Sequence, residues 1–481
     1  MTSITCRLLI KLTCIAALLL CVDSLLGNDS PSENRRLPNV VFIMSDNHSP
    51  STLGCYGNAD VLTPNIDALA REGTMFNKAF SCSPACSPSR ASILTGLLPC
   101  QHGQIDICSR SINNECKSKP ELLDSMKTLP QILSETGYNC HAIGKFHLEG
   151  KGPDYKGFSS WTTLPYLAGG APWITTTYIK NGKQGFAETN DTEFFSQCAV
   201  DWIKENAGAE QPFFLYLSYN VPTGYGMQNR SRNKHLEYYR KALNTIFYPA
   251  DAENSEAHLT YCRIFASSIT LMDEGIGSIM KTLKETDVEN DTVVVFTSDQ
   301  GVPAGRYGHF SRSPNFVRCL KDGCVDVPLI FRHPKHVEAG RRSDRLVSHY
   351  DLMPTLLSYL GMKGKLPAAP KQPGRDYSAE LRGTRIEDWD DTIYFDYRNW
   401  ERGVRTKDWM LFVARGGLSD TKTATHNEET ALYDMNEDPG QTNDLSQRPE
   451  YQEIKNRLYR QLSDYFKQHA HPDYQWKMED G

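Results

Sequence analysis

Five short runs of consecutive apolar residues, rich in β-branched side chains, constrain the fold of this chain more than any other feature. They are Val40–Met44, Asn139–Ile143, Phe213–Leu217, Val293–Phe296 and Val327–Phe331. Because their apolarity is continuous rather than alternating, each run predicts a strand covered on both faces of its sheet. Helical patterns lie between them, at residues 65–72, 129–136 and 266–285. This alternation predicts an α/β fold with a large, mostly parallel sheet sandwiched by helices.

The pattern changes after a polar segment rich in Pro and Lys, residues 363–375, which we expect to be a loop or linker. Beyond it the predicted strands are short, at residues 392–397, 409–414 and 431–434. One amphipathic helix is then predicted over residues 451–469. These elements predict a smaller α+β C-terminal subdomain.

Residues 1–27 have the three parts of a secretory signal peptide. Arg7 and Lys11 give a basic start, residues 12–22 are apolar, and Ser24 and Gly27 are small residues near a cleavage point. The apolar run is shorter than the roughly 20 residues that a membrane-spanning helix needs. No later stretch is apolar enough to span a bilayer, so we expect no transmembrane segment and an exported protein, whether secreted, periplasmic or lysosomal.

Charge and composition exclude other classes. The 52 Lys and Arg against 58 Asp and Glu give a formal charge of −6, which argues against a nucleic-acid binder because no excess of cations could displace phosphate counterions. A chain with 39% hydrophobic and 10% aromatic residues is not disordered.

Polar residues follow three of the predicted strands. Asp46 and Asn47 follow the first run, and Asp299 and Gln300 follow the fourth, while the second leads into residues 144–147, Gly-Lys-Phe-His. Ligands of open α/β sheets bind beyond the carboxyl ends of the strands. Carboxylate and amide oxygens suit a hard divalent cation, and a lysine and a histidine beside it suit an anionic oxyacid. One such Asp alone is more often a cap or turn former, but several together favour a metal site.

The sharpest local signal is the segment 86–96, CSPSRASILTG. Cys86 lies in a Ser/Pro turn, close to Arg90 and just before an apolar, helix-like stretch. A thiol at a helix N-terminus beside an arginine has a lowered pKa. Such a cysteine can be a nucleophile, half of a disulfide or a metal ligand, and the spacing does not choose among these.

This segment resembles the signature of the type I, formylglycine-dependent sulfatases of the alkaline-phosphatase-like superfamily. Further segments resemble that family in the same order, at residues 53–57, 63–70, 144–147, 298–301, 327–330, 347–355 and 432–439. The resemblance implies an alkaline-phosphatase-like fold, with a sulfatase catalytic domain over 36–385 and a C-terminal subdomain over 386–481. It also implies a sulfatase that acts on a sulfated carbohydrate, because the motif resembles those of glycosaminoglycan sulfatases.

The resemblance further implies that Cys86 is converted to formylglycine by a formylglycine-generating or sulfatase-maturating enzyme. One hydroxyl of the hydrated aldehyde would attack sulfur, and the second would allow the release of sulfate. By the same resemblance, residue 86 and four neighbours would hold a metal, calcium or alternatively magnesium: Asp46, Asn47, Asp299 and Gln300. The remaining implied catalytic residues are Arg90, Lys145 and Arg312 for charge and His147 as proton acceptor, with Lys321 as a rival to Arg312.

Two departures from the family pattern leave alternatives open. Asn47 and Gln300 stand where many relatives have Asp and either Asn or His, which leaves less negative charge on the metal. Thr223 stands where relatives often have the histidine that protonates the leaving oxygen, and His309 is a conceivable substitute. The alternatives are a phosphodiesterase or phosphonate hydrolase of the same superfamily, and a catalytically dead carbohydrate-binding homologue. Residues 164–185 and 224–256 are the loops expected to set specificity.

The cysteine count divides with the chemistry. Of 14 cysteines, three lie in the predicted signal peptide and one is residue 86. Ten remain, an even number that could pair in an oxidising compartment. Cys319 and Cys324 are close enough in sequence to form a local disulfide.

Overall fold

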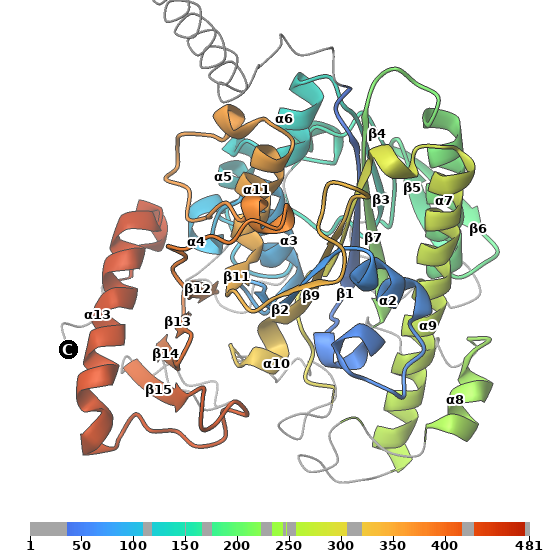
Figure 1. Ribbon diagram of the computed structural model, residues 1–481. Coiled ribbons are helices and arrows are strands. Elements are labelled where there is room, and N and C mark those ends of the chain that lie inside the picture. The colour runs from blue at the N-terminus through green and yellow to red at the C-terminus, as the bar shows by residue number, and fades with distance from the viewer. Residues whose placement is uncertain are drawn as a thin grey trace, which may run out of the picture. The chain divides into compact units, whose positions relative to one another are not determined.

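A mixed sheet lies between two layers of helices (Figure 1). The computed structural model describes residues 36–108, 118–149, 151–165, 176–222, 233–243, 247, 256–304, 320–415 and 428–476. The strands of the sheet are β1 (Asn39–Asp46), β2 (Thr74–Phe80), β3 (Asn139–Gly144), β4 (Ser160–Thr163), β5 (Thr176–Lys180), β6 (Lys183–Ala187), β7 (Phe213–Pro222), β8 (Thr292–Ser298), β9 (Asp326–Arg332), β10 (Arg341–Ser343) and β11 (Val347–Ser348). Their order is β10-β2-β9-β8-β1-β7-β3-β4-β5-β6, with β11 beside β2.

The five predicted strands are all present, as β1, β3, β7, β8 and β9. At the centre of the sheet β8, β1, β7 and β3 are neighbours and run parallel, which confirms the predicted class of fold. Every residue of β1, β7 and β8 is buried, as their continuous apolarity predicts. The direction of β9 is not readable from its apolar run, and this strand is antiparallel to both β8 and β2.

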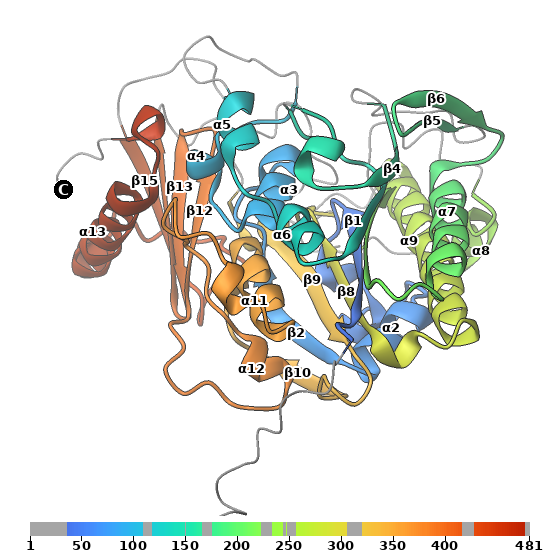
Figure 2. The ribbon, with the colours of Figure 1, turned by 90° about the horizontal axis from the view of Figure 1, so that it is seen from above.

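Helices cover both faces of this sheet. Their bounds are α2 (Pro64–Arg71), α3 (Cys86–Thr95), α4 (Pro99–His102), α5 (Pro120–Ser125), α6 (Leu129–Glu135), α7 (Asp191–Asn206), α8 (Leu236–Ala242), α9 (Glu256–Glu285), α10 (Asp322–Val325), α11 (Leu352–Tyr359), α12 (Ser378–Leu381) and α13 (Gln452–His469). Figure 2 shows α2, α7 and α9 on one face and α3, α6 and α11 on the other. None of the described helices has the length and apolarity of a membrane-spanning segment.

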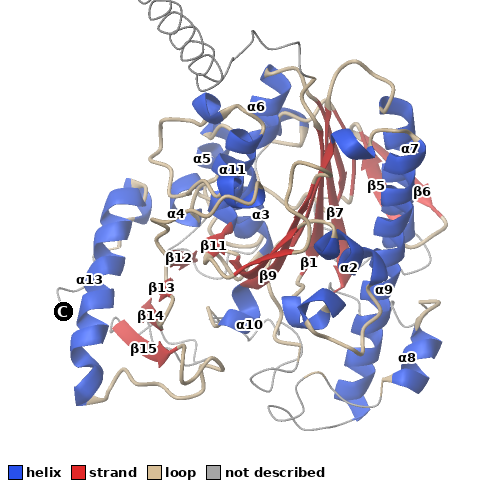
Figure 3. Ribbon diagram, viewed as in Figure 1, coloured by secondary structure: helices blue, strands red, loops and turns tan. Residues whose placement is uncertain are grey.

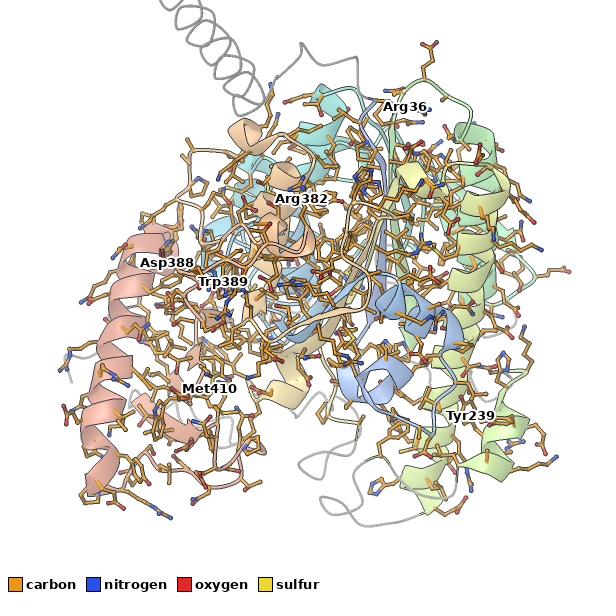
Figure 4. All side chains as sticks on the ribbon, viewed as in Figure 1. Arg36, Tyr239, Arg382, Asp388, Trp389 and Met410 are labelled. Atoms are coloured by element: carbon orange, nitrogen blue, oxygen red, sulfur yellow. The ribbon has the colours of Figure 1, made fainter. Side chains whose placement is uncertain are left out.

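The helices are fixed by apolar packing and by a few polar contacts. The core on the α7 and α9 face joins strand residues such as Ile43 to Phe265 of α9. Tyr239, labelled in Figure 4, lies on α8, and its hydroxyl accepts from the Leu62 amide at 2.8 Å. The same hydroxyl lies 2.6 Å from Oγ1 of Thr270 on α9. This side chain therefore joins α8, α9 and the turn before α2.

A second, antiparallel sheet forms the C-terminal part of the chain, with α13 packed against it (Figure 3). Its strands are β12 (Thr392–Tyr397), β13 (Glu401–Thr406), β14 (Trp409–Arg415) and β15 (Glu428–Asp434). Three strands and the helix were predicted, whereas β13 was missed. The sequence of β13 is charged, yet Arg402 and Arg405 are almost fully buried. Arg402 is fully buried because Asp396 of β12 pairs with it, at 3.4 Å between Nε and Oδ1.

Residues 38–481 group as one compact unit that contains both sheets. The boundary between a catalytic domain ending at 385 and a subdomain starting at 386 therefore stays a prediction. The predicted signal peptide, residues 1–27, lies outside the described residues.

Candidate active site

The polar strand ends meet at one edge of the central sheet. Asp46 ends β1, Asp299 follows β8, and Lys145 follows β3. Since these strands are parallel and separated only by β7, their carboxyl ends lie together. Cys86 is the first residue of α3, and ligand atoms of Cys86, Asp46 and Asp299 all lie within 4.8 Å of one another. The structure thus brings together residues from four separate parts of the sequence.

Arg90 joins these groups from one turn along α3. Its side chain is fully buried, with Nη2 2.8 Å from Asp299 Oδ2 and 3.3 Å from Asp46 Oδ2. Nη1 donates to the Lys145 carbonyl at 2.5 Å and to Ser218 Oγ at 2.6 Å. Burial by itself would lower the pKa of Arg90, but the two carboxylates raise it overall. The guanidinium therefore stays charged and holds both carboxylates in place.

Lys145 reaches the same centre from β3. Its Nζ pairs with Asp46 Oδ2, and its side chain is 14% exposed. Burial works to lower the pKa of Lys145, and the charge of Asp46 raises it overall. The preceding Gly144 has φ +94°, and a Cβ there would lie 1.9 Å from the Ser218 carbonyl oxygen. Only glycine fits this close approach, which lets the chain turn so that Lys145 enters the site.

Two amide side chains surround the Cys86 sulfur. Gln300 Nε2 donates to Asn47 Oδ1 and lies 3.3 Å from Cys86 Sγ. Asn47 Oδ1 lies 4.0 Å from the same sulfur, and the backbone N–H of Asn47 donates to Asp299 Oδ1 at 3.0 Å. All four residues implied as metal ligands together with residue 86 therefore lie around one point.

The donor set fits a hard divalent cation. Burial, and then the charge of Asp299, raises the pKa of Asp46, and a cation between these carboxylates would offset that repulsion. Gln300 Oε1 is buried and has no hydrogen-bond partner among the described residues. Two carboxylates and two amide oxygens are ligands that suit calcium or magnesium. In the hydrated formylglycine that the sequence resemblance implies, hydroxyl oxygens would take the place of the Cys86 sulfur in this set.

His147 follows Lys145 by two residues and has a left-handed backbone, at φ +54°. Its carbonyl accepts from Cys108 Sγ at 3.3 Å, and that sulfur is also 3.2 Å from Ser87 Oγ. These contacts connect the His147 turn to the residue that follows Cys86.

Several predicted residues lie outside the described part of the chain. Arg312, His309 and Thr223 are among them, as are residues 166–175 of the first predicted specificity loop and residues 224–232, 244–246 and 248–255 of the second. The rest of the first loop includes β5 and the start of β6. Lys321, the rival to Arg312, is described: its Nζ donates to the Gln441 carbonyl at 2.7 Å and lies 5.3 Å from the Tyr433 ring. Its contacts are thus with the C-terminal sheet and the turn after it.

The structure also includes groups that sequence reasoning missed. Ser218 of β7 accepts from Arg90, although it lies inside an apolar run and has no local signal. Ser89 falls within the cysteine motif, and its hydroxyl donates to the Asp299 carbonyl. His349 falls within segment 347–355, which was matched without a role for this residue, and its Nδ1 lies 2.8 Å from Ser89 Oγ.

The ten remaining cysteines do not all form disulfides in the structure. Six are free thiols in it, namely Cys55, Cys82, Cys100, Cys140, Cys198 and Cys262. An even count permits pairing but does not place two Cβ atoms at bonding distance. Cys82 Sγ, for example, donates to Ser92 Oγ at 3.1 Å. Cys319, one half of the predicted local pair, lies outside the described residues.

The fold and the site together define a class of enzyme. A helix that begins at a buried cysteine, two cations and a group of carboxylates that could hold a metal lie at the edge of a parallel sheet, and these groups suit the hydrolysis of tetrahedral anionic esters. The family model described as Sulfatase matches residues 38–362, and the one described as N-sulphoglucosamine sulphohydrolase, C-terminal, matches residues 305–468. The chain belongs to the type I sulfatase family and is a sulfuric ester hydrolase.

Curated relatives match over most of their length. An N-acetylglucosamine-6-O-sulfatase of Bacteroides thetaiotaomicron is 23% identical, over 93% of this chain and 89% of its own. The N-acetylgalactosamine-6-sulfatase of Mus musculus is 26% identical, over 87% of this chain and 84% of its own. A solved complex of the protein BT4656 with its substrate D-glucosamine-2-N,6-O-disulfate superposes with a TM-score of 0.74 at 22% identity, over 91% of this chain and 99% of that one. This superposition confirms the fold.

Proposed function

We propose that the protein is an exported sulfatase that removes sulfate from a sulfated carbohydrate of the glycosaminoglycan type. The observation that carries this proposal is the position of Cys86, whose sulfur lies among two carboxylates and two amides, beside the network of Arg90 and Lys145. Relatives named for hexosamine 6-sulfates support a hexosamine substrate. The complex with a glucosamine N,O-disulfate keeps the N-sulfate as a second candidate bond.

The metal would be held by the two carboxylates and the two amides. Asp46, Asn47, Asp299 and Gln300 would supply these oxygen ligands, with calcium as the preferred ion and magnesium as the alternative. A bound cation supplies the positive charge that makes an oxygen nucleophile available at neutral pH. Formylglycine at position 86, made by a maturating enzyme, supplies two hydroxyls on one carbon, and so both a nucleophile and a route for releasing sulfate.

The remaining roles follow from the charges of the site. Arg90 holds Asp46 and Asp299 at a fixed separation, so these ligands do not have to reorganise during the reaction. Lys145 offsets the negative charge of the sulfate group, and Arg312 is expected to do so from the segment after β8. His147 would accept the proton from the diol of residue 86 when sulfate is released.

Export and maturation complete the proposal. The signal-peptide pattern of residues 1–27, with its basic start, apolar run and small residues, supports export. The finished enzyme would then be secreted, periplasmic or lysosomal.

The experiment is a panel of substrates with the protein made in its native host. Hexosamines sulfated at O6, hexosamines sulfated at N2 and the matching phosphate esters would be compared by released sulfate or phosphate. We expect sulfate release, lost on calcium removal, with a preference for one of the two hexosamine sulfates. Faster turnover of the phosphate esters would support the phosphodiesterase or phosphonate hydrolase alternative. No turnover of any ester would support the dead homologue.

A further inference from the structure

His349 contacts Ser89, a neighbour of the candidate metal ligands, and is not itself one of those ligands. It begins the short 3₁₀ turn His349–Asp351 that follows β11, and it is 2% exposed. Its Nδ1 lies 2.8 Å from Ser89 Oγ. Ser89 lies one turn after Cys86 on α3, and its hydroxyl donates to the backbone carbonyl of Asp299. A chain of contacts therefore runs from His349 through α3 to a metal-ligand segment.

The direction of these hydrogen bonds follows from the number of protons that each group can donate. A carbonyl oxygen only accepts, so the single hydroxyl proton of Ser89 is used on Asp299. Nδ1 of His349 must then carry a proton and donate it to Ser89 Oγ. Burial lowers the pKa of His349 to about 3 and so favours the neutral ring. The histidine is thus held in the tautomer protonated at Nδ1.

The turn that carries His349 is itself anchored. The Ser348 amide donates to Asp351 Oδ2 at 2.8 Å, and Arg375 Nη2 lies 2.8 Å from the same oxygen. The imidazole therefore projects from a turn with little freedom to shift. At the other end of this series of contacts, the carboxylate of Asp299 accepts from Arg90 and from the backbone N–H of Asn47. Asp299 is held at its side chain and at its carbonyl, and α3 supplies the group at each end.

We propose that His349 is a positioning residue that sets the Asp299–Gln300 segment relative to residue 86 through the hydroxyl of Ser89. The inference rests on the proposed metal site. Groups that orient metal ligands without touching the metal typically change metal affinity by about 10–100-fold when they are removed. His349 should act in this way on a backbone carbonyl rather than on a ligand side chain.

The alternative is a core histidine that only fills space, and the chain offers a matched control for it. His141 is also buried, at 5% exposed, and its Nδ1 lies 2.6 Å from Ser160 Oγ. Its ring stacks on Trp202, so its described contacts are with β4 and α7 rather than with the metal-ligand segments. Replacing either histidine by phenylalanine keeps an aromatic ring and removes the ring nitrogen that forms a hydrogen bond with a serine hydroxyl.

The experiment compares His349→Phe, His349→Asn and His141→Phe in the full chain. Calcium affinity is measured by titration calorimetry, thermal unfolding is followed without calcium, and kcat and KM are determined separately. We expect His349→Phe to bind calcium at least 10-fold more weakly and to lose kcat rather than gain KM. His349→Asn, whose side-chain amide can still donate to Ser89, should recover most of both losses. His141→Phe should unfold at a temperature as low as that of His349→Phe but bind calcium like the wild type.

The inference is overturned if His349→Phe binds calcium like the wild type, or if His349→Asn is no better than His349→Phe. It is also overturned if His141→Phe loses calcium affinity equally. A wild-type protein that binds no calcium overturns both this inference and the metal part of the proposed function. A wild type that binds calcium but releases no sulfate contradicts the proposed function, and the comparison of affinities still decides the role of His349.

Discussion

Two fully buried arginines of this protein both pair with buried aspartates, but their other neighbours differ. Arg90 at the active site pairs with Asp46 and Asp299, and Arg402 in the C-terminal sheet pairs with Asp396. Both guanidinium groups and all three carboxylates are shielded from water. A buried ion pair is by itself weak evidence about stability or function, because desolvation offsets much of the attraction. The surroundings distinguish the two.

The surroundings of Arg402 are closed. Its Nη2 donates to the Tyr474 carbonyl at 2.9 Å, and the guanidinium lies 4.1 Å from the Phe466 ring and 5.1 Å from the Trp476 ring. One carboxylate and two aromatic faces use its charge. This arginine therefore connects the C-terminal sheet to α13 and to the segment after it.

The surroundings of Arg90 are charged and adjoin a reactive group. Two carboxylates share it, and one of them also pairs with Lys145. Without a metal, two anions and two cations are concentrated beside Cys86, which is 7% exposed. Such a cluster is expensive to bury, and buried charge clusters beside a reactive side chain are typical of functional sites. We therefore propose that Arg402 stabilises the fold and that Arg90 positions the groups of the active site.

The largest effect should come from breaking the C-terminal pair. Arg402→Met leaves Asp396 buried and unpaired, so the free energy of unfolding should fall by about 3–5 kcal/mol. Urea unfolding measures the loss, and kcat of the folded fraction should stay close to that of the wild type. Arg385→Met is the control, because Arg385 is 78% exposed in its ion pair and should change stability by no more than about 0.5 kcal/mol. A large loss of kcat in folded Arg402→Met would contradict the proposal that Arg402, unlike Arg90, acts on stability alone.

Arg90→Gln should reverse that pattern. The amide can still donate to one carboxylate but carries no charge, so kcat/KM should fall by about 10²–10³-fold, as for the loss of a transition-state donor. Steady-state kinetics measures this loss, and added calcium should restore much of the thermal stability of the variant. Calcium-loaded Arg90→Gln with normal kcat/KM would contradict a catalytic role for this arginine.

Acidification should lower the free energy of unfolding of the protein. Burial lowers the pKa of His48, His102 and His349 to about 3, below the ordinary value of 6.5. Between these values the unfolded chain binds protons that the folded chain does not. Stability is therefore complete above about pH 6.5 and falls as the pH drops toward 3, by up to about 1.4 kcal/mol per pH unit for each histidine. Asp273, whose pKa burial raises to about 6, opposes this with a single proton.

Urea unfolding at pH 7 and pH 5 tests the direction of this effect. His102→Gln is the informative variant, since Ser92 Oγ lies 3.0 Å from His102 Nε2 and a glutamine amide can bond there without titrating. The variant should lose less stability than the wild type between the two pH values. An equal loss in both proteins would show that His102 does not contribute.

The smallest effect sharpens the account of the metal. Asn47→Asp adds a carboxylate where Asn47 Oδ1 now accepts from Gln300 Nε2, a bond that a carboxylate can also accept. Calcium affinity should rise by about tenfold because ligand charge tunes affinity. Titration calorimetry measures the change, with Asn436→Asp on the surface as control. Weaker calcium binding by Asn47→Asp would contradict this expectation and would show that the site binds the ion better with a neutral amide at position 47 than with a carboxylate.

Much of the fold and site could be predicted because the relevant signals are local. A continuous apolar run that ends in Asp46 or Asp299 encodes both a buried strand and a polar group at its carboxyl end. The signals that failed are non-local. The strand β13 could not be predicted because Arg402 reads as an exposed residue, whereas its partner Asp396 on β12 allows it to be buried. The direction of β9 is not encoded in the periodicity of its apolar residues. His349 contacts Ser89 across 260 residues, and no spacing rule reports such a contact.

The central claim is that Cys86 is the precursor of the reactive group and not a structural thiol. The most direct test is the mass of the peptide that contains residue 86, taken from protein made in its native host and in a matched sample of Arg402→Met. We expect an aldehyde residue in place of the thiol in both samples. Unmodified cysteine in every molecule of the wild type would contradict it.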